Sequence, residues 1–562
     1  MTQEALLDST VRGTPLAEET LGALTLGGFF REVCQANAAK EALVFYPPSG
    51  PVVRSTYAQI WEEAFAIARA LVARGVTKQT RVGLLCSNRP EWITAMFGIA
   101  LAGGTSVLLS TFAKGAELEY QLRLGDVSLL IFERSLLDRD FAAELLEICP
   151  ELGGDQAVVR STKMPFLRGA ICIGERPSWG PALEVWPDFF RGDKLAPASI
   201  VEAIAAEVAP TDQGLIVFSS GSTAKPKAVL HAHRGPAIQC WRQRRIFNVD
   251  PDVRIWSANG FFWSGNFAMA IGTAFGAGGC LVLQRTFAPG EALRLMQDER
   301  VTYPIAWPHQ WARLIQDPEF QKVNLSSLRY VGETCAMRTH PTVKTDWQEP
   351  VAAYGNTETF TLSTIHFSGT DPSIMQGNHG APLPGNTIRI VDPITGKLLK
   401  RNEVGEIAVK GPTMMLGYLR TVPEDLFDDE GFFRTGDGGF VDDAGRLHWQ
   451  GRLNDIIKTG GANVSPLEID AILRECPGVK IAATVGVPHE TLGEIVVACI
   501  VSKPDATLDE ATIRAFVSKR LSSYKVPRRV LFVSESDITL TSSNKVKTAP
   551  LRELAARRLA TD

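Results

Sequence analysis

The sequence lacks the features that would place it in several protein classes. Its nine cysteines stand singly, without a CxxC pair, so we expect reduced core thiols rather than a disulfide framework. A formal net charge of −4 over 562 residues argues against a general nucleic-acid or anionic-membrane binder. The longest apolar-looking stretch, 267–283, is broken by four glycines and is too short to span a bilayer. Residues 1–13 have no signal-peptide core, so we expect a cytoplasmic enzyme.

What the sequence does contain is an alternation of helix and strand patterns over residues 25–147. Apolar residues recur at helical spacing over 60–74, and a second helical pattern covers 91–102. Short apolar runs predict strands at 81–86, 106–109 and 126–133. Strands and helices joined by short connections indicate a mostly parallel sheet. Residues 148–210 are richer in Pro, Gly and charge, and we expect an irregular excursion there.

A loop rich in hydroxyl groups and lysines, 219–229, follows the apolar run 215–218, which suits a buried strand. Such a loop can wrap a polyphosphate, because backbone N–H and hydroxyl groups donate hydrogen bonds and lysines neutralise charge. Its spacing is not that of a Walker A loop, and a solvated Ser/Gly linker is the alternative that this segment alone leaves open. His231 and His233 follow just beyond the loop, and the favoured interpretation is that they make structural hydrogen bonds.

Four later segments offer groups that suit a magnesium-nucleotide. Residues 354–358, YGNTE, combine a ring for a base, a glycine for close approach, a hydroxyl for phosphate and a carboxylate for Mg²⁺. Asp437 can accept hydrogen bonds from both ribose hydroxyls. Residues 451–458 and 541–547 carry an arginine and lysines for phosphate. Taken singly, each segment could equally be a solvated loop.

In this order the segments resemble the motifs of the adenylate-forming superfamily, which contains acyl-CoA synthetases, luciferases and peptide-synthetase adenylation domains. The resemblance runs from about residue 25 to the C-terminus. It implies an α/β fold with a large N-terminal adenylate-forming domain of mixed sheets, 1–453, and a small mobile C-terminal α/β domain, 454–562. Four positions depart from the family pattern: Ala224, Ala228 and Asn544 stand where the family has glycine usually or often, and Asn454 replaces the usual hinge Asp or Lys.

The resemblance also implies roles for individual residues. Lys545, Thr223 and Glu358 would be catalytic, with Glu358 also holding Mg²⁺, and Asn454 would be the hinge. The residues implied to bind ATP or coenzyme A are Ser219, Ser220, Gly221, Ser222, Thr223, Lys227, Tyr354, Gly355, Asn356, Thr357, Asp437, Arg452, Lys458, Gly460 and Gly461. Those implied to line the acid pocket are Phe262, Trp263, Trp307, Gly332, Glu333 and Thr334. On chemistry alone, the rings of 260–272 would suit a core helix better than a pocket.

The implied reaction has two steps. A carboxylate attacks the α-phosphorus of ATP to give an acyl-adenylate and pyrophosphate, and the thiol of coenzyme A then displaces AMP. A carboxylate is already ionised at neutral pH, so no general base is required. Our first hypothesis is an acyl-CoA synthetase for a fatty, alicyclic or aromatic acid. The alternatives are a ligase that passes the acyl group to an amine or carrier-protein thiol, and a non-catalytic nucleotide-binding relative. No nucleic-acid partner is expected, and a homodimer is one option for the assembly.

Overall fold

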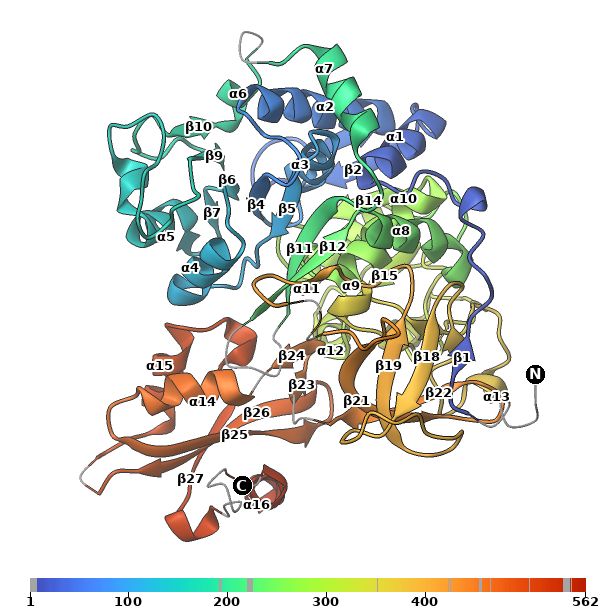
Figure 1. Cartoon of the computed structure of the whole chain (residues 1–562), viewed down its shortest axis with the longest axis vertical. Helices are drawn as coiled ribbons and strands as arrows, with labels where there is room; N and C mark the ends of the chain where they lie inside the picture. The colour runs from blue at the N-terminus through green and yellow to red at the C-terminus, as the bar shows by residue number, and fades with distance from the viewer. Residues whose placement is uncertain are drawn as a thin grey trace.

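The structure is a computed structural model and describes residues 8–191, 195–219, 226–350, 352–422, 424, 426–453, 457–464, 466–504, 506–538, 546 and 548–561. It divides into a large part and a smaller one, drawn in red at the bottom of Figure 1. The two buried clusters of the smaller part contain only residues from 457 onward. The predicted α/β class, a large N-terminal and a small C-terminal domain, is confirmed. The boundary at 453/454 stays a prediction, because Asn454 lies outside the described residues.

The largest sheet of the big domain is mixed. Its inner strands pair in parallel, whereas the strands on either side of the 219–229 loop pair antiparallel. Its order is β10 (Leu183–Val185), β9 (Gly169–Ile173), β6 (Leu129–Glu133), β4 (Arg81–Leu85), β5 (Thr105–Leu108), β11 (Gln213–Ser219), β12 (Lys227–Ala232) and β20 (Gly417–Tyr418). The three strands predicted before residue 134 are confirmed. The expected irregular excursion at 148–210 was wrong in part, because β9 is a fully buried strand beside β6.

Two further sheets complete the large domain, with short ladders between β7 (Ser135–Leu136) and β8 (Arg139–Asp140) and between β16 (Thr364–Ile365) and β17 (Ala381–Pro382). One sheet has the order β15 (Tyr303–Ile305), β13 (Arg254–Ser257), β14 (Cys280–Leu283), β2 (Glu41–Phe45) and β3 (Val53–Thr56). The other has the order β1 (Val11–Arg12), β18 (Thr387–Val391), β19 (Gly405–Lys410), β21 (Phe433–Val441) and β22 (Leu447–Arg452). The N-terminal strand β1 thus lies beside β18, hundreds of residues later (Figure 1).

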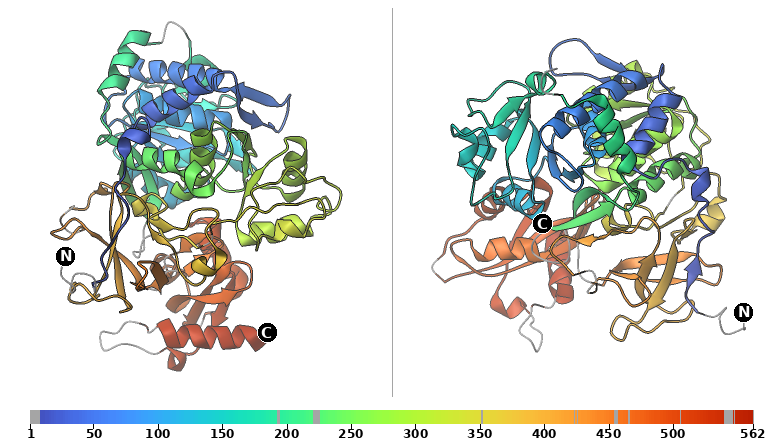
Figure 2. Two further views of the ribbon diagram at one scale, coloured as in Figure 1. Left: turned by 90° about the vertical axis from the view of Figure 1, so that its right-hand side faces the viewer. Right: turned by 45° about the horizontal axis from the view of Figure 1, so that its top comes forward.

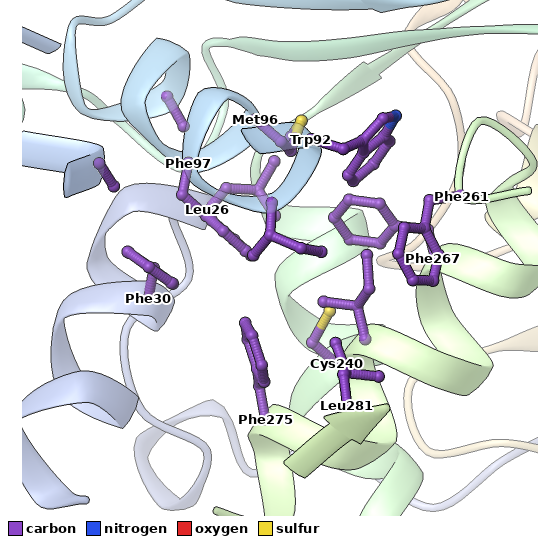
Figure 3. Packing of buried hydrophobic residues seen from close by; sticks show 14 of the residues in the cluster. Leu26, Phe30, Trp92, Met96, Phe97, Cys240, Phe261, Phe267, Phe275 and Leu281 are labelled. Atoms are coloured by element: carbon purple, nitrogen blue, oxygen red, sulfur yellow. The ribbon is translucent and has the colours of Figure 1, made fainter. Parts of the chain in front are cut away.

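Helices fill the space between these sheets. Both helices predicted before residue 103 are present, as α2 (Tyr57–Ala73) and α3 (Pro90–Leu101). Figure 3 shows the buried core in which Trp92, Met96 and Phe97 of α3 lie. The Phe97 ring stacks on Phe30, with centroids 4.2 Å apart. The other large-domain helices are α1 (Leu26–Ala36), α4 (Gly115–Leu124), α5 (Phe141–Ile148), α6 (Trp186–Phe189), α7 (Ala198–Glu207), α8 (Arg234–Phe247), α9 (Ser264–Asn266), the π-helix η4 (Phe267–Gly272), α10 (Thr273–Ala277), α11 (Pro289–Asp298), α12 (Pro308–Gln316) and α13 (Pro372–Met375).

The small domain is a sheet flanked by helices (Figure 2). The sheet runs β24 (Ala462–Val464), β23 (Ile457–Thr459), β26 (Gly493–Ser502) and β25 (Val479–His489), with β27 (Arg529–Phe532) also paired to β26. Its helices are α14 (Pro466–Arg474), α15 (Glu510–Ser518), α16 (Thr548–Thr561) and the 3₁₀ turn η8 (Ser523–Lys525). Nine free cysteines, eight of them buried, agree with the predicted reduced thiols. Within the described residues no helix has the length and apolar character needed to cross a membrane.

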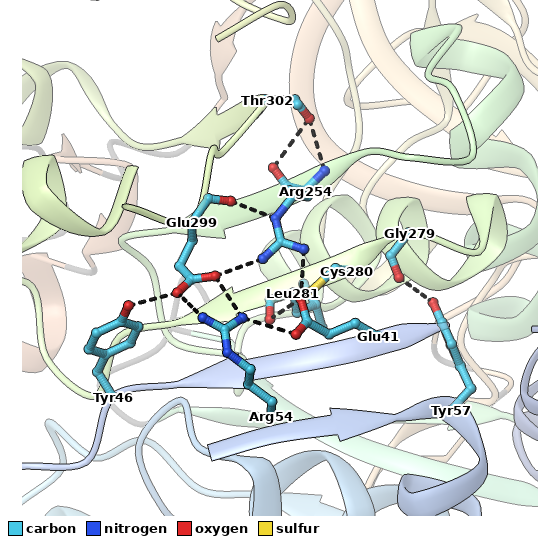
Figure 4. Close-up of polar contacts among 10 residues, drawn as sticks. All are labelled: Glu41, Tyr46, Arg54, Tyr57, Arg254, Gly279, Cys280, Leu281, Glu299 and Thr302. Carbon is cyan, nitrogen blue, oxygen red and sulfur yellow. Dashed lines mark hydrogen bonds and ion pairs between the residues drawn. The ribbon is translucent and has the colours of Figure 1, made fainter. Parts of the chain in front are cut away.

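A network of charged side chains links strands of the β15–β3 sheet to the end of helix α11 (Figure 4). The Glu299 carboxylate, 3% exposed, accepts hydrogen bonds from Arg54 at 2.6 Å, Arg254 at 2.9 Å and the Tyr46 hydroxyl at 2.6 Å. Arg254 also donates to Glu41 at 2.7 Å. We call Glu41, Tyr46, Arg54, Arg254 and Glu299 the Glu299 cluster. It joins β2, β3 and β13 to the end of α11, all within the large domain.

Candidate functional site

A cavity of about 610 Å³ opens where the two domains meet. Its walls include residues from β11, β12, the 354–358 segment, β21 and the small domain. The lining residues that the sequence singled out are Ser219, Lys227, Trp263, Trp307, Gly355, Asn356, Thr357, Glu358 and Gly461. Segments distant in sequence therefore converge on one space.

The ends of the predicted phosphate loop face each other on the cavity wall. Ser219 and Lys227 are opposite partners in the antiparallel pair β11–β12, and residues 220–225 between them lie outside the described residues. The Lys227 ammonium lies 4.3 Å from the centre of the Tyr418 ring. The Tyr418 hydroxyl in turn donates to Glu358 Oε1 at 2.7 Å. Lys227 and Glu358 are thus fixed by contacts with one aromatic side chain.

The 354–358 segment is held in shape by hydrogen bonds. Asn356 Oδ1 accepts from the backbone N–H of Thr359 at 2.9 Å and so caps the 3₁₀ turn η6 (Thr357–Thr359). Burial lowers the pKa of His231 to about 4, so the ring is neutral near pH 7 and its Nε2–H donates to the Thr357 carbonyl at 2.8 Å. The structural role favoured for His231 is confirmed. At Gly355, a Cβ would lie 1.7 Å from the Thr361 carbonyl oxygen, so only glycine fits.

Asp437 lies just behind the cavity wall formed by Thr435 and Gly436, and it is almost fully buried. Its carboxylate accepts from the Tyr354 hydroxyl at 2.9 Å and from Trp449 Nε1 at 3.3 Å. The Tyr354 ring packs in the core of the β18–β21 sheet and is not part of the cavity lining. Here Tyr354 orients Asp437, and the predicted stacking on adenine stays a prediction. Arg452 pairs with Asp437 through the backbone.

The small domain presents the turn between β23 and β24 to the cavity. Gly461 has φ of +81°, and a Cβ there would lie 2.5 Å from the Trp307 ring. The Lys458 ammonium lies 2.9 Å from the centre of the Trp449 ring, whose N–H reaches Asp437. Helix α16, which follows the predicted lysine Lys545, lies on the side of the small domain away from the large one (Figure 1). The turn, and not α16, faces the site.

Some predicted residues are not brought to the cavity. Phe262 is buried in the core behind Trp263, and Gly332, Glu333 and Thr334 are not among the described residues that line the cavity. Tyr354, Asp437, Lys458 and Gly460 are likewise absent from that lining. Ser220, Gly221, Ser222, Thr223, Asn454 and Lys545 lie outside the described residues. Their roles remain predictions.

Several residues of the site carry little or no signal in the sequence. Tyr418 fixes Glu358, and Glu406 accepts hydrogen bonds from Arg434 and from the Gly436 N–H, at 2.8 and 2.9 Å. Arg434 stands three residues before Asp437, the predicted ribose ligand, so its position could have been flagged from the sequence. Tyr524, from the small domain, also lines the cavity and had no such signal.

Comparison with known proteins agrees with this geometry. The chain is 31% identical over 511 residues to a methyl-dioxo-octahydroindenyl-propanoyl:CoA ligase of Mycobacterium tuberculosis, covering 89% of this chain and 94% of that protein. It is 26% identical to the human mitochondrial medium-chain acyl-CoA ligase ACSF2, covering 96% and 89%. Among solved structures, the amide bond synthetase McbA of Marinactinospora thermotolerans matches with a TM-score of 0.73 and 26% identity, covering 94% and 99%.

The match to family models extends over both domains. The AMP-binding enzyme family model covers residues 30–419, and the model of the AMP-binding enzyme C-terminal domain covers residues 468–545. The first of these alone spans more than half of the chain and includes Ser219, Lys227 and the 354–358 segment. This chain belongs to the AMP-binding enzymes of the adenylate-forming superfamily.

Proposed function

We propose that this chain is an AMP-forming acyl-CoA synthetase, which joins a carboxylic acid to AMP and then passes the acyl group to coenzyme A. The observation that carries the proposal is the single cavity of about 610 Å³ at which β11–β12, residues 355–358, Thr435-Gly436 and the small-domain turn at Gly461 meet. A two-step ligase needs groups for both half-reactions beside one α-phosphate, and a cavity walled by both domains supports such a role.

The nucleotide would lie along the large-domain wall. The β11–β12 hairpin, with Ser219, Lys227 and the loop residues 220–223, would hold the phosphates, and Thr357 would bind the α-phosphate. A carboxylate can accept several hydrogen bonds, so Asp437 would take the ribose hydroxyls while still accepting from Tyr354 and Trp449. Arg452 would add charge nearby.

Glu358 has the chemistry of a magnesium ligand. It is a carboxylate on the cavity wall, the ligand type that Mg²⁺ takes beside substrate phosphates, and the Tyr418 hydroxyl fixes one of its oxygens. When bound, the ion would neutralise phosphate charge. Glu358 would hold the ion in the cavity that Lys227 also lines.

Catalysis of the first step would be electrostatic. Carboxylate and triphosphate are both anions, and a positive charge about 4 Å from a developing negative one is worth roughly 4 kcal/mol at an effective dielectric near 20. That upper value corresponds to about a thousandfold in rate. Lys545 would supply this charge after the small domain turns about Asn454, and Thr223 would donate to the phosphates.

In the arrangement seen here the small domain would serve the second step. Lys458, Gly460 and Gly461 stand on the turn facing the site, where the coenzyme A thiol would approach the acyl-adenylate. Trp263 and Trp307 on the cavity wall favour a bulky apolar acid, whether fatty, alicyclic or aromatic. Gly332, Glu333, Thr334 and Phe262 belong to the same proposed acid pocket. A cytoplasmic location and a homodimer complete the proposal.

Pyrophosphate and AMP release from a panel of acids, with and without coenzyme A, tests the function. We expect pyrophosphate release with the cognate acid, AMP release that depends on coenzyme A, and an acyl-CoA product by mass spectrometry. Lys545→Ala should lose adenylation by about a thousandfold while still converting supplied acyl-adenylate to thioester. Absence of pyrophosphate release with every acid would favour the non-catalytic alternative.

A second candidate, transfer of the acyl group to an amine, is favoured by the structural match to an amide bond synthetase. The same assay distinguishes the two. If the adenylate forms without coenzyme A dependence and amines, but not coenzyme A, release AMP, the amide-forming function is correct.

A further inference from the structure

One buried cluster of charged groups joins the small domain to helix α4 of the large domain. The carboxylate of Glu117 accepts three hydrogen bonds from the small domain: from Lys525 Nζ at 2.6 Å, and from the backbone N–H and hydroxyl of Ser522 at 2.9 and 2.5 Å. Lys525 also donates to Glu468 Oε1 at 2.9 Å. The side chains of Glu117, Glu468 and Lys525 are 2–4% exposed. We call these four residues the Glu117 cluster.

Only Glu117 belongs to the large domain. Ser522 directly precedes η8, Lys525 is the last residue of η8, and Glu468 lies in α14, so the three would move together if the small domain turned. Figure 1 shows α4 facing α14 and α15 across the domain boundary. Such a turn would leave Lys525 paired with Glu468 and would return the Glu117 carboxylate to water. The cluster is therefore complete only in an arrangement like the present one.

The cluster is next to the reaction site without touching it. Between Ser522 and Lys525 lies Tyr524, which lines the cavity and packs against Phe112 and Trp263 with ring centroids 6.2 Å apart in each case. The β24 strand, which follows Gly461, also contacts η8. Fixing residues 522–525 on α4 thus fixes the wall and the turn that would receive the thiol.

The hydrogen bonds of Glu117 are of the strong kind, because the acceptor is a carboxylate and one donor is an ammonium. They are buried and hence little screened by salt. These hydrogen bonds stabilise only the present domain arrangement, because water would hydrate the Glu117 carboxylate in the other one. A contact that exists in only one of two domain arrangements shifts the equilibrium toward that arrangement by the free energy that the contact contributes.

We propose that Glu117 is a positioning residue for the second half-reaction, which holds the small domain in the thioester-forming arrangement through Ser522 and Lys525. This rests on the proposed function, in which the small domain serves the two steps in different arrangements.

Single-turnover rates of both half-reactions test the proposal, with Glu117→Gln against Glu119→Gln. Glu119 lies on the same helix but at the surface, where it pairs with Lys163 and Arg123. We expect Glu117→Gln to slow thioester formation from supplied acyl-adenylate at least about tenfold and to leave pyrophosphate release within about twofold. Glu119→Gln should change neither rate.

Equal slowing of both half-reactions by Glu117→Gln, or no slowing, would overturn the proposal. If Glu117→Gln does not fold, Ser522→Ala removes a single hydrogen bond, and a selective slowing of about threefold is then expected. No selective slowing by Ser522→Ala would likewise overturn the proposal. A wild-type chain that forms no thioester at all would instead refute the proposed function, so the two failures are distinguishable.

Discussion

The Glu299 cluster and the Glu117 cluster use the same chemistry for different purposes. In each cluster a buried carboxylate lies 2.6–2.9 Å from the cationic group or groups that it pairs with. In the first, two arginines serve the Glu299 carboxylate, and every member belongs to the large domain. In the second, two carboxylates share one lysine across the domain boundary. The first cluster can only stabilise a fold, whereas the second can also select an arrangement of domains.

The difference also appears in the titration of the carboxylates. Burial would raise the pKa of Glu299, but hydrogen bonds from Arg54 and Tyr46 outweigh it, and the pKa lies below the ordinary value. Burial raises the pKa of Glu468 to about 7, since one lysine must compensate two carboxylates. The lowered pKa keeps Glu299 ionised at neutral pH, which suits a lasting contact with Arg54 and Arg254.

The largest effect should come from Glu299→Gln. Removing the central charge leaves Arg54 and Arg254 without a shared acceptor, and we expect a loss of roughly 2–3 kcal/mol in the free energy of unfolding, because Arg54 is half exposed and recovers part of its hydration. Chemical denaturation measures this change. The matched variant Glu430→Gln breaks an exposed pair with Arg389 and should cost less than about 0.5 kcal/mol. If the two variants lose the same free energy of unfolding, burial is not what makes the Glu299 pairs more stabilising.

The next effect, on the domain interface, should come from Gly461→Leu. A side chain there collides with Trp307, so the turn cannot approach the cavity, and we expect thioester formation from supplied acyl-adenylate to fall at least about thirtyfold. Pyrophosphate release should persist. Gly75→Leu is the control, because Gly75 has a similar φ, +80° against +81°, but open space around it. If Gly461→Leu loses both half-reactions while Gly75→Leu keeps both, the two steps do not use different arrangements of the small domain.

The smallest effect concerns pH. A carboxyl group with a raised pKa in the folded state contributes stability that is present below about pH 4.5 and is lost as the pH rises through about 7. Glu468→Gln should therefore remove roughly 1–2 kcal/mol of pH dependence in the unfolding free energy between pH 4.5 and 7. Glu299, with a lowered pKa, should give the opposite sign, with stability lost below about pH 4.5. An unchanged pH profile in Glu468→Gln would refute this assignment.

Much of the site could be predicted because motif residues carry their chemistry in short segments. The superfamily, the enzyme class and the two-domain α/β fold follow from five motifs in order, and the comparisons confirm them. Local periodicity placed α2, α3, β4, β5 and β6. Periodicity failed at β9, because a strand buried on both faces among Pro-rich loops shows no alternation.

Contacts between distant segments could not be predicted. Nothing in the sequence near Glu117 or Lys525 reveals that α4 meets η8, since the two are about 400 residues apart. Likewise, nothing in the 354–358 motif indicates that the Tyr354 hydroxyl donates to Asp437 while the ring packs in the core of the β18–β21 sheet. Such pairings depend on tertiary packing between segments that are far apart in the sequence.

The most direct test is a crystal structure with a non-hydrolysable acyl-adenylate analogue of the cognate acid. We expect its phosphate mimic beside Thr357 and Lys227 and its acyl group toward Trp263, within the cavity that Gly461 lines, and its ribose hydroxyls at the Thr435-Gly436 wall on Asp437. An analogue bound on another surface, with Lys227, Thr357 and Asp437 making no contact to it, would contradict the central claim that one cavity joins the acid to AMP.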